Sequence, residues 1–177
     1  PGKSKLDIPA FQFTSGSSQV SGKFNIRNFD QPKISAILDG HLAMSDLKAL
    51  LQSDTISKAE GFLKLNVKTE GSPDPKKDFE AAMLRDFNTS GELDFENVSF
   101  HLDKSPLKAD ALSGKMVFND NDLVLNNFKG MLSGSDFSLD GTLKNMLPWL
   151  FSEKEDMVIE ATLKSNELNL NKLLSDE

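Results

Sequence analysis

The sequence predicts a mainly β protein: a curved, largely antiparallel sheet forming an open groove or half-barrel, with two or three short helices. Three observations predict this fold class. Apolar side chains recur at every second position along most of the chain, short polar turns separate these runs, and glycines interrupt the apolar positions. Side chains alternate between the two faces of a strand, so a period of two indicates strands with one apolar face.

The alternating runs predict roughly nine or ten strands. The pattern is clearest where Val20, Gly22, Phe24 and Ile26 alternate with polar residues. The runs cover 20–27, 34–42, 61–69, 91–95, 98–102, 112–118, 123–128, 128–143 and 157–163. Most are joined by short polar turns such as the one at 119–122, which is typical of an antiparallel meander.

Helical patterns are few and short. Ser45 and Asp46 form an expected N-terminal cap ahead of a leucine-rich turn at 47–52. Residues 75–87 place Phe79, Met83 and Phe87 at a spacing of four, which puts them on one helical face. A third candidate covers 143–151 and is interrupted by a proline. The loop near 71–77, with two prolines, is the expected flexible point.

Glycine lies unusually often on the apolar side of the predicted strands. Of the 11 glycines, those in phase with the apolar residues of their strand are Gly22, Gly40, Gly61, Gly91, Gly114, Gly130, Gly134 and Gly141. Such glycines can mark bulges and bends in a twisted sheet. Alternatively, they leave gaps in a concave apolar face, into which a chain-like ligand could settle. The sequence leaves both interpretations open.

Composition excludes several classes of function. The 177 residues carry a net charge of −7 with scattered lysines, so the chain lacks the basic surface of a nucleic-acid-binding protein. There is no cysteine, which removes thiol chemistry and disulfides. The sequence contains neither an apolar run long enough to span a membrane nor a secretory signal pattern. We expect residues 1–177 to form a single β-rich domain, and to be a fragment of a longer protein.

No pattern of catalytic or metal-binding residues stands out. The two histidines, His41 and His101, lie in predicted strands without the neighbours of a catalytic triad. Asp120, Asn121 and Asp122 are dense in oxygen ligands but lack the glycine and distal glutamate of a calcium loop. The glycines form no nucleotide-binding loop. We therefore predict a protein that is not an enzyme and has no cofactor or metal.

Two further features are ambiguous. The only tryptophan, Trp149, lies in the apolar stretch 146–151, which either plugs the end of the sheet core or contacts a membrane or partner. The segment from Leu42 also resembles the segment from Leu163: each has a strand ending in leucine, then a serine, then an amphipathic turn ending in Leu-Leu. A true internal repeat would make the chain part of a longer periodic array.

The cadence of strands and glycines resembles that of the AsmA-like family of bacterial envelope proteins, in the region near their carboxyl end. The resemblance rests on TSGELDFENVSF at 89–100, on LSGKMVFNDNDLVLNNFKGMLSGSDFSLDGTL at 112–143, and on the endings SDLKALL and NLNKLL. It covers about 24–174. It implies a β-groove in the periplasm, within a full-length protein anchored in the inner membrane, that shields phospholipid or other acyl-chain lipid.

From this resemblance and the alternation together, we expect a β-groove segment involved in phospholipid transport between membranes or in outer-membrane assembly and maintenance. The expected lipid-contacting residues are Phe24, Ile26, Leu38, Leu65, Leu93, Phe95, Met116, Phe118, Leu125, Leu132, Phe137 and Leu139. Polar alternate positions such as Lys64 and Lys115 are expected on the wet outer face. The alternative is a structural or adaptor domain with a filled core, which binds other envelope proteins through its sheet edges.

Overall fold

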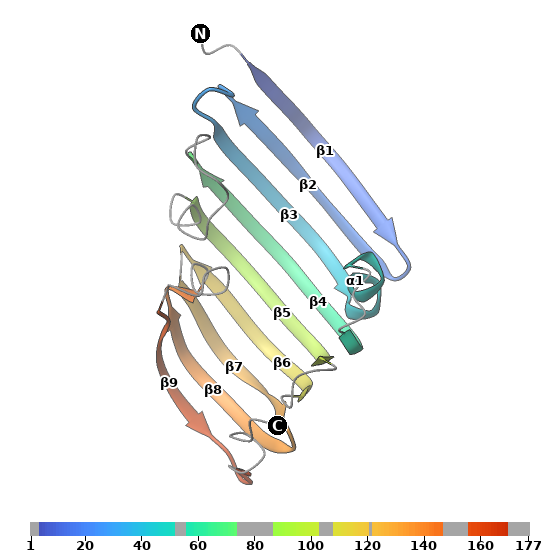
Figure 1. Ribbon diagram of the computed structural model, residues 1–177, viewed down its shortest axis with the longest axis vertical. Helices are drawn as coiled ribbons and strands as arrows, with labels where there is room; N and C mark the ends of the chain where they lie inside the picture. Colours follow the sequence, from blue (N-terminus) through green and yellow to red (C-terminus); the bar gives the residue numbers. More distant parts are fainter. Residues whose placement is uncertain are drawn as a thin grey trace.

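A single antiparallel sheet contains every strand of the protein that the structure describes. The computed structural model describes residues 4–51, 56–73, 87–102, 108–120, 122–146 and 156–169. The elements are β1 (Lys5–Ser15), β2 (Ser18–Arg27), β3 (Lys33–Ala43), α1 (Met44–Leu51), β4 (Ile56–Gly71), β5 (Phe87–Leu102), β6 (Lys108–Asn119), β7 (Asp122–Leu132), β8 (Ser135–Lys144) and β9 (Val158–Lys164). Each strand pairs with its neighbours in the chain, so the sheet runs in order from β1 to β9 (Figure 1).

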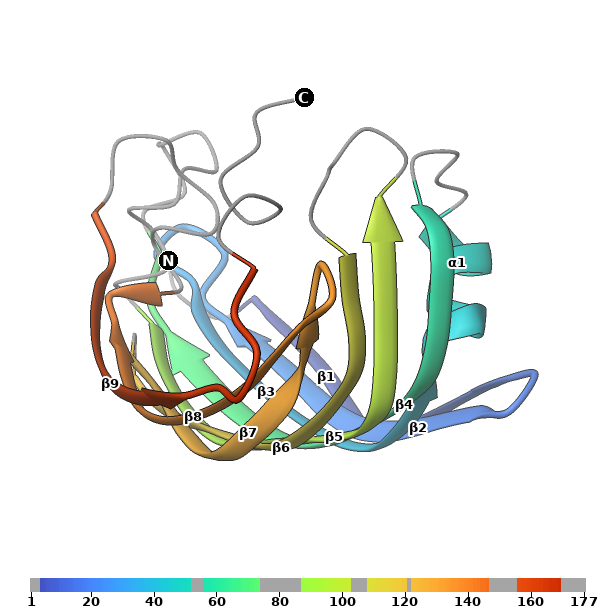
Figure 2. The ribbon, with the colours of Figure 1, turned by 90° about the horizontal axis from the view of Figure 1, so that it is seen from below.

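The sheet is bent into an open trough. Figure 2 looks along the row of strands and shows their two ends rising on the same side, so that the section of the sheet is a U. β1 and β9 lie at opposite edges and do not pair with each other, so the sheet is not closed into a barrel. The predicted curved, open, largely antiparallel sheet is confirmed.

Several of the glycines on the apolar side of their strands adopt backbone conformations, or approach a neighbouring strand so closely, that a side chain would not be tolerated. Gly91 has φ 125° and Gly114 has φ 131°, conformations that residues with a side chain rarely adopt. A Cβ at Gly91 would lie 2.0 Å from the carbonyl oxygen of Asn66 on β4, which is closer than any real contact. Gly134 was expected within a strand but lies in the turn between β7 and β8. These positions support the interpretation of the glycines as bending points of the sheet.

β1 is a strand that the alternation did not predict, because Pro9 interrupts its apolar pattern. Proline has no N–H to donate and is tolerated at sheet edges and bulges. β1 satisfies both conditions: it is an edge strand, and its pairing with β2 is irregular between Ile8 and Phe11, around Pro9. The apolar residues Ile8 and Phe11 therefore both pair with β2, opposite Phe24 and Gly22.

The helix α1 lies beside the first residues of β4, at the end of β3 (Figures 1 and 2). Met44 belongs to a buried cluster with Ile56, Ala59 and Val98, and Leu47 packs against it. The helix starts at Met44, one residue before the predicted cap. The carboxylate of Asp46 instead accepts hydrogen bonds from the Ser17 backbone N–H (2.9 Å) and the Ser18 hydroxyl (2.7 Å). The helix is thereby tied to the turn between β1 and β2.

Some predicted boundaries are wrong. Phe87 was assigned to a helix, but it begins β5 because it pairs with Gly71 at the end of β4. The rest of the predicted 75–87 helix lies outside the described residues, as do positions 74–77 of the predicted flexible loop. Leu143 and Lys144 pair with β9 and belong to β8, and Trp149 and the rest of the predicted 143–151 helix after Met146 are not described. The predicted strands 91–95 and 98–102 are one strand, β5, with an irregularity between Phe95 and Val98.

Candidate functional site

The strand register sorts the side chains of the sheet into two faces. Residues that pair across an antiparallel sheet point to the same side. Phe24 pairs with Ala36 and Leu38 with Val67, which places these apolar residues on one face of β2, β3 and β4. Leu65 pairs with Leu93 and Leu93 with Met116, which carries the same face across β5 to β6. This set of positions is called the inner face below, and the other set the outer face.

All twelve predicted lipid-contacting residues lie on the inner face. Met116 pairs with Leu125, Gly130 with Phe137 and Phe128 with Leu139, so the face continues across β7 and β8. It reaches the edge strand β9, where Leu163 pairs with Leu139. Leu132 and Ser135 flank a two-residue turn, so their backbone N–H and C=O groups bond to each other across it. In an L-residue, the edge toward which these backbone groups point determines the face on which the side chain lies. For Ser135 this is the face that lines the hollow of the trough, and the other inner-face residues lie on the same side.

The floor of the trough contains buried apolar side chains on β7. Leu123 is 3% exposed, Leu125 2% and Phe128 6%, all on the inner face. The rings of Phe95 and Phe128 meet edge to face with centroids 5.2 Å apart, although β6 lies between their strands. Gly114 of β6 pairs with Phe95, and a Cβ there would lie 2.7 Å from the Cα of Phe128. At this point the gap left by a glycine is filled by aromatic rings of neighbouring strands.

Toward both edges the inner face exposes large apolar side chains. On β1 and β3 these are Leu6 (42%), Phe13 (42%) and Leu38 (36%). On β9 they are Ile159 (58%) and Leu163 (55%). Exposed apolar side chains that share one continuous face indicate a contact surface more than scattered ones do. The inner face thus combines a packed floor with apolar residues that remain open to an occupant.

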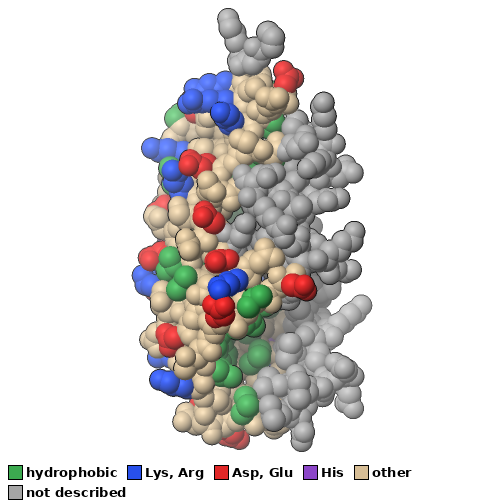
Figure 3. All heavy atoms as spheres, turned by 90° about the vertical axis from the view of Figure 1, so that its left-hand side faces the viewer, with side chains coloured by type: hydrophobic (Ala, Val, Ile, Leu, Met, Phe, Trp, Pro, Cys, Tyr) green, Lys and Arg blue, Asp and Glu red, His purple; other side chains and the backbone are tan. Residues whose placement is uncertain are grey.

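The outer face carries ion pairs between adjacent strands, and it also exposes the apolar side chains of Ile37, Phe62, Met131 and Val158. Lys64 pairs with Glu96, Lys115 lies 3.0 Å from Glu92, and Lys144 lies 2.6 Å from Glu160. Charged side chains of both signs are spread over the surface seen in Figure 3. The hydrogen bonds that Lys64 and Lys115 donate to the facing glutamates raise the pKa of both lysines. Pairs this exposed add little stability, and they keep this side of the sheet hydrated.

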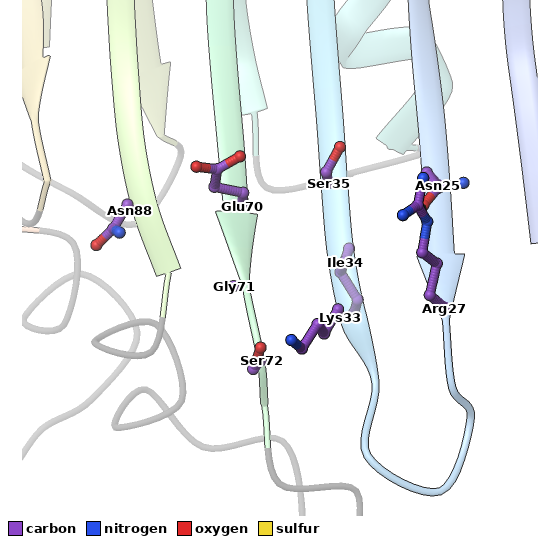
Figure 4. Close-up of a pocket in the computed structure, with 9 residues that line it drawn as sticks. All are labelled: Asn25, Arg27, Lys33, Ile34, Ser35, Glu70, Gly71, Ser72 and Asn88. Carbon is purple, nitrogen blue, oxygen red and sulfur yellow. The ribbon is translucent and has the colours of Figure 1, made fainter. Parts of the chain in front are cut away.

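A shallow groove of about 480 Å³ lies on the outer face (Figure 4). Polar side chains from four neighbouring strands surround it, including Asn25, Ser35, Glu70 and Asn88. Lys33 and Arg27 lie at the same end of the sheet. Ile34 also lines the groove, but Arg27, Lys33 and Glu70 surround it with charged side chains, so it is a mixed and largely hydrated surface.

His101, Asp110 and Lys58 form a cluster of titratable groups on three adjacent strands. Nε2 of His101 lies 2.9 Å from Oδ1 of Asp110, and Nζ of Lys58 lies 3.0 Å from the same oxygen. Burial raises the pKa of Asp110, but the hydrogen bonds from Lys58 and His101 outweigh it, so its pKa is lowered. The cluster joins β4, β5 and β6 side by side.

Asp136, at the start of β8, holds the segment that follows β9. Its carboxylate accepts hydrogen bonds from the backbone N–H groups of Glu167 (2.7 Å) and Asn166 (2.9 Å) and from the hydroxyl of Ser165 (3.1 Å). These bonds, those from the two backbone groups first, lower the pKa of Asp136 to about 2. Asp136 thereby ties the start of β8 to the residues that follow β9.

Among the described residues, histidine, aspartate and glutamate side chains do not gather in any group of three suited to a metal ion. None of the helical segments described is both long and apolar enough to cross a bilayer.

Comparison with known proteins places the chain in no group. No family model matches the sequence. No curated protein and no solved structure is significantly similar to it.

Proposed function

We propose that this chain is a non-enzymatic β-groove segment of an AsmA-like envelope protein that holds acyl chains of phospholipid along its inner face. The observation that carries the proposal is the continuity of that face: one apolar surface crosses all the strands from β1 to β9 and exposes large apolar side chains. In this proposal the groove contributes to phospholipid transport between membranes, or to outer-membrane assembly and maintenance.

The dimensions of the trough suit an acyl chain. Nine strands have eight spacings of about 4.8 Å, which gives a trough roughly 38 Å long. One leaflet of a bilayer contributes about 15 Å of hydrocarbon thickness, half of the usual core. A single acyl chain therefore fits within the trough along its axis, with length to spare.

The energetics favour such an occupant. Each methylene removed from water contributes about 0.8 kcal/mol, so a dozen contribute about 10 kcal/mol before the cost of ordering the chain. A face without a dense pattern of hydrogen-bond donors suits a ligand without polar groups along its length. The charged outer face, with pairs such as Lys115 and Glu92, would remain in water.

The cellular setting follows from the family resemblance alone. We propose a periplasmic location, with the full-length protein anchored in the inner membrane and in contact with membranes through its other parts. Envelope proteins are further proposed partners, and nucleic acid is not.

Native mass spectrometry with lipid extraction tests the proposal on the chain purified from a bacterial host under mild conditions. We expect near-stoichiometric phospholipid. Leu38 and Ile37 offer a matched pair, because they are neighbours on β3 with similar exposure (36% and 40%) and lie on opposite faces. Leu38→Glu should release the lipid, whereas Ile37→Glu should retain it.

The result that would overturn the lipid proposal is a folded wild-type chain without lipid, or equal lipid retention in both variants. Circular dichroism and the unfolding midpoint of each variant confirm that the comparison is made between folded proteins. A lipid-free wild type would favour the structural alternative, in which the edges of the sheet bind other envelope proteins. That alternative has its own support, since the outer edges of β1 and β9 pair with no described strand.

A further inference from the structure

Three cationic side chains lie in one row at an end of the outer face. Lys5 of β1 pairs with Arg27 of β2, and Arg27 pairs with Lys33 of β3. Residues that pair across antiparallel strands have Cβ atoms about 4.5–5.5 Å apart, and like charges at such positions destabilise a sheet. Figure 3 shows lysine and arginine side chains gathered near the upper end of the molecule, where Figure 1 places the start of β1 and the turn between β2 and β3.

This row differs from the rest of the described sheet. In the other pairings of the described strands, wherever both residues are Lys, Arg, Asp or Glu, their charges have opposite signs. Lys64 and Asp94 pair in this way, and so do Asp94 and Lys115. The whole chain is acidic, with a net charge of −7. Three adjacent cations in such a chain repel one another, and an anion bound between them would offset that repulsion.

Nearby carboxylates balance this charge only in part. The ammonium of Lys5 lies 2.6 Å from the carboxylate of Asp7, which also accepts a hydrogen bond from the amide of Asn25 (3.1 Å). Arg27 donates from Nε to the side-chain oxygen of Asn25 (3.1 Å). In the part of the chain that the structure describes, no carboxylate forms an ion pair with Arg27 or Lys33. The ammonium of Lys33 and the terminal amino groups of Arg27 can therefore donate to a ligand.

Neutral donors lie beside these two cations in the outer-face groove. The hydroxyls of Ser35 and Ser72 and the amide of Asn88 line the groove, and none of the three side chains forms a hydrogen bond with a described residue. Figure 4 shows the Lys33 side chain extending from β3 toward β4, on the side where Ser72 follows that strand. The volume of about 480 Å³ lies within the range of small-ligand sites, about 300–1,000 Å³.

One carboxylate in the groove restricts the kind of ligand that it suits. Glu70 pairs with Ser35 on one side and with Asn88 on the other, and its carboxylate lies 3.3 Å from the ammonium of Lys68. Ser35 and Lys33 are successive outer-face residues of β3, so the rows of Glu70 and Lys33 are about 7 Å apart. Glu70 would repel a second anionic group and would accept a hydrogen bond from a hydroxyl.

We propose that this groove binds a phosphate group attached to a small polyol, with the phosphate held by Arg27 and Lys33 and a hydroxyl donating to Glu70. A guanidinium donates two parallel hydrogen bonds to phosphate oxygens, and an ammonium adds a donor and a second positive charge. Both side chains are exposed, so they can turn toward a shared anion. Glycerol phosphate has this chemistry, either free or as the headgroup of phosphatidylglycerol. The site lies on the opposite face from the inner-face residues and does not depend on acyl chains bound there.

Isothermal titration calorimetry of the whole chain with glycerol 3-phosphate tests the phosphate contact. Arg27→Gln should weaken binding about tenfold or more, because it removes the two-bond contact. Lys23→Gln is the matched control, since Lys23 is exposed on the same face of β2 and lies four residues away, about 13 Å and beyond the Debye length. It should change the affinity less than about twofold. The proposal would be overturned if the wild type showed no saturable binding, or if the two folded variants lost affinity equally.

Glu70→Gln tests the hydroxyl contact. The wild type should bind glycerol 3-phosphate more tightly than inorganic phosphate, because only the former donates a hydroxyl to Glu70. The variant should lose this preference while binding inorganic phosphate at least as tightly, since a repulsive charge has been removed. A preference that survives in Glu70→Gln would refute the assignment of the hydroxyl to this residue.

Vesicles distinguish a free ligand from a lipid headgroup. Sedimentation with phosphatidylcholine vesicles is compared with and without added phosphatidylglycerol. Additional binding to phosphatidylglycerol that Arg27→Gln loses and Lys23→Gln keeps would identify the headgroup as a ligand of the groove. Binding of glycerol 3-phosphate without this additional vesicle binding would identify the free polyol phosphate. If neither is observed with the folded wild type, the groove does not bind phosphate and the proposal fails.

Discussion

Replacing Phe128 with alanine is expected to destabilise the sheet by about 4 kcal/mol. Its side chain is 6% exposed, and its ring contacts Phe95 at 5.2 Å and Phe137 at 6.1 Å between centroids. Truncating a buried phenylalanine costs about 3–5 kcal/mol, and each lost aromatic contact accounts for roughly 0.5–1.5 kcal/mol of such a value. Both contacts are lost at once, which places the expected cost in the upper half of the range.

Urea unfolding followed by circular dichroism measures this cost. With a slope of about 2 kcal/mol per molar urea, a loss of about 4 kcal/mol lowers the midpoint by about 2 M. Phe13→Ala is the control, because Phe13 also lies on the inner face but is 42% exposed. Its truncation should cost about 1 kcal/mol, since less apolar surface is buried. Similar midpoints for the two variants would refute the inference that rings from neighbouring strands fill the space above Gly114.

Three further predictions concern the backbone, a buried hydroxyl and pH. Gly91→Ala should cost about 1–3 kcal/mol in urea unfolding, because a Cβ there meets the carbonyl oxygen of Asn66; an unchanged midpoint would show that the strand can relax. Ser18→Ala should cost about 1–3 kcal/mol, since it leaves the Ala43 N–H without its acceptor, and a neutral result would contradict that tie. The pKa of Asp136 is lowered to about 2, so the stability that its carboxylate contributes is present above about pH 4 and lost as the pH falls toward 2. Unfolding midpoints across that range should fall more steeply for the wild type than for Asp136→Asn, and parallel curves would remove Asp136 as the cause.

Local alternation predicted the faces of the sheet well. Phe24, Leu93 and Leu139 come from strands far apart in the sequence, yet a period of two within each strand placed them on the same face. The alternation of apolar residues within a strand, and the turns at its ends, depend only on residues close together in the sequence. Neighbouring strands in a meander also pair through short connections. The open, curved form was also predicted, because the glycines indicated bending.

Other features depend on contacts that no local pattern contains. Pro9 prevented the prediction of β1, because a strand tolerates proline only in positions such as the edge of a sheet, and the edge position of β1 is not visible in the sequence. Phe87 fitted a helical spacing, but its pairing with Gly71 decides its conformation. The contact between Phe95 and Phe128 crosses an intervening strand. The sequence echo around Leu42 and Leu163 does not align the strands as their pairing does, because Leu163 pairs with Leu139 on β8 whereas Gly22, the equivalent position on β2, pairs with Leu38.

The order of the strands, in which each pairs only with its neighbours in the chain, has a mechanical consequence. A force applied to the two ends of the described sheet acts on β1 and β9 first, and it separates each outer strand from one neighbour at a time. Under stretching, the strands would separate one after another, each at low force, and the sheet would not unfold in a single step at high force. An edge strand of such a trough can unfold while the central strands remain folded. Tension between the ends would therefore reduce the number of paired strands before the whole sheet unfolded.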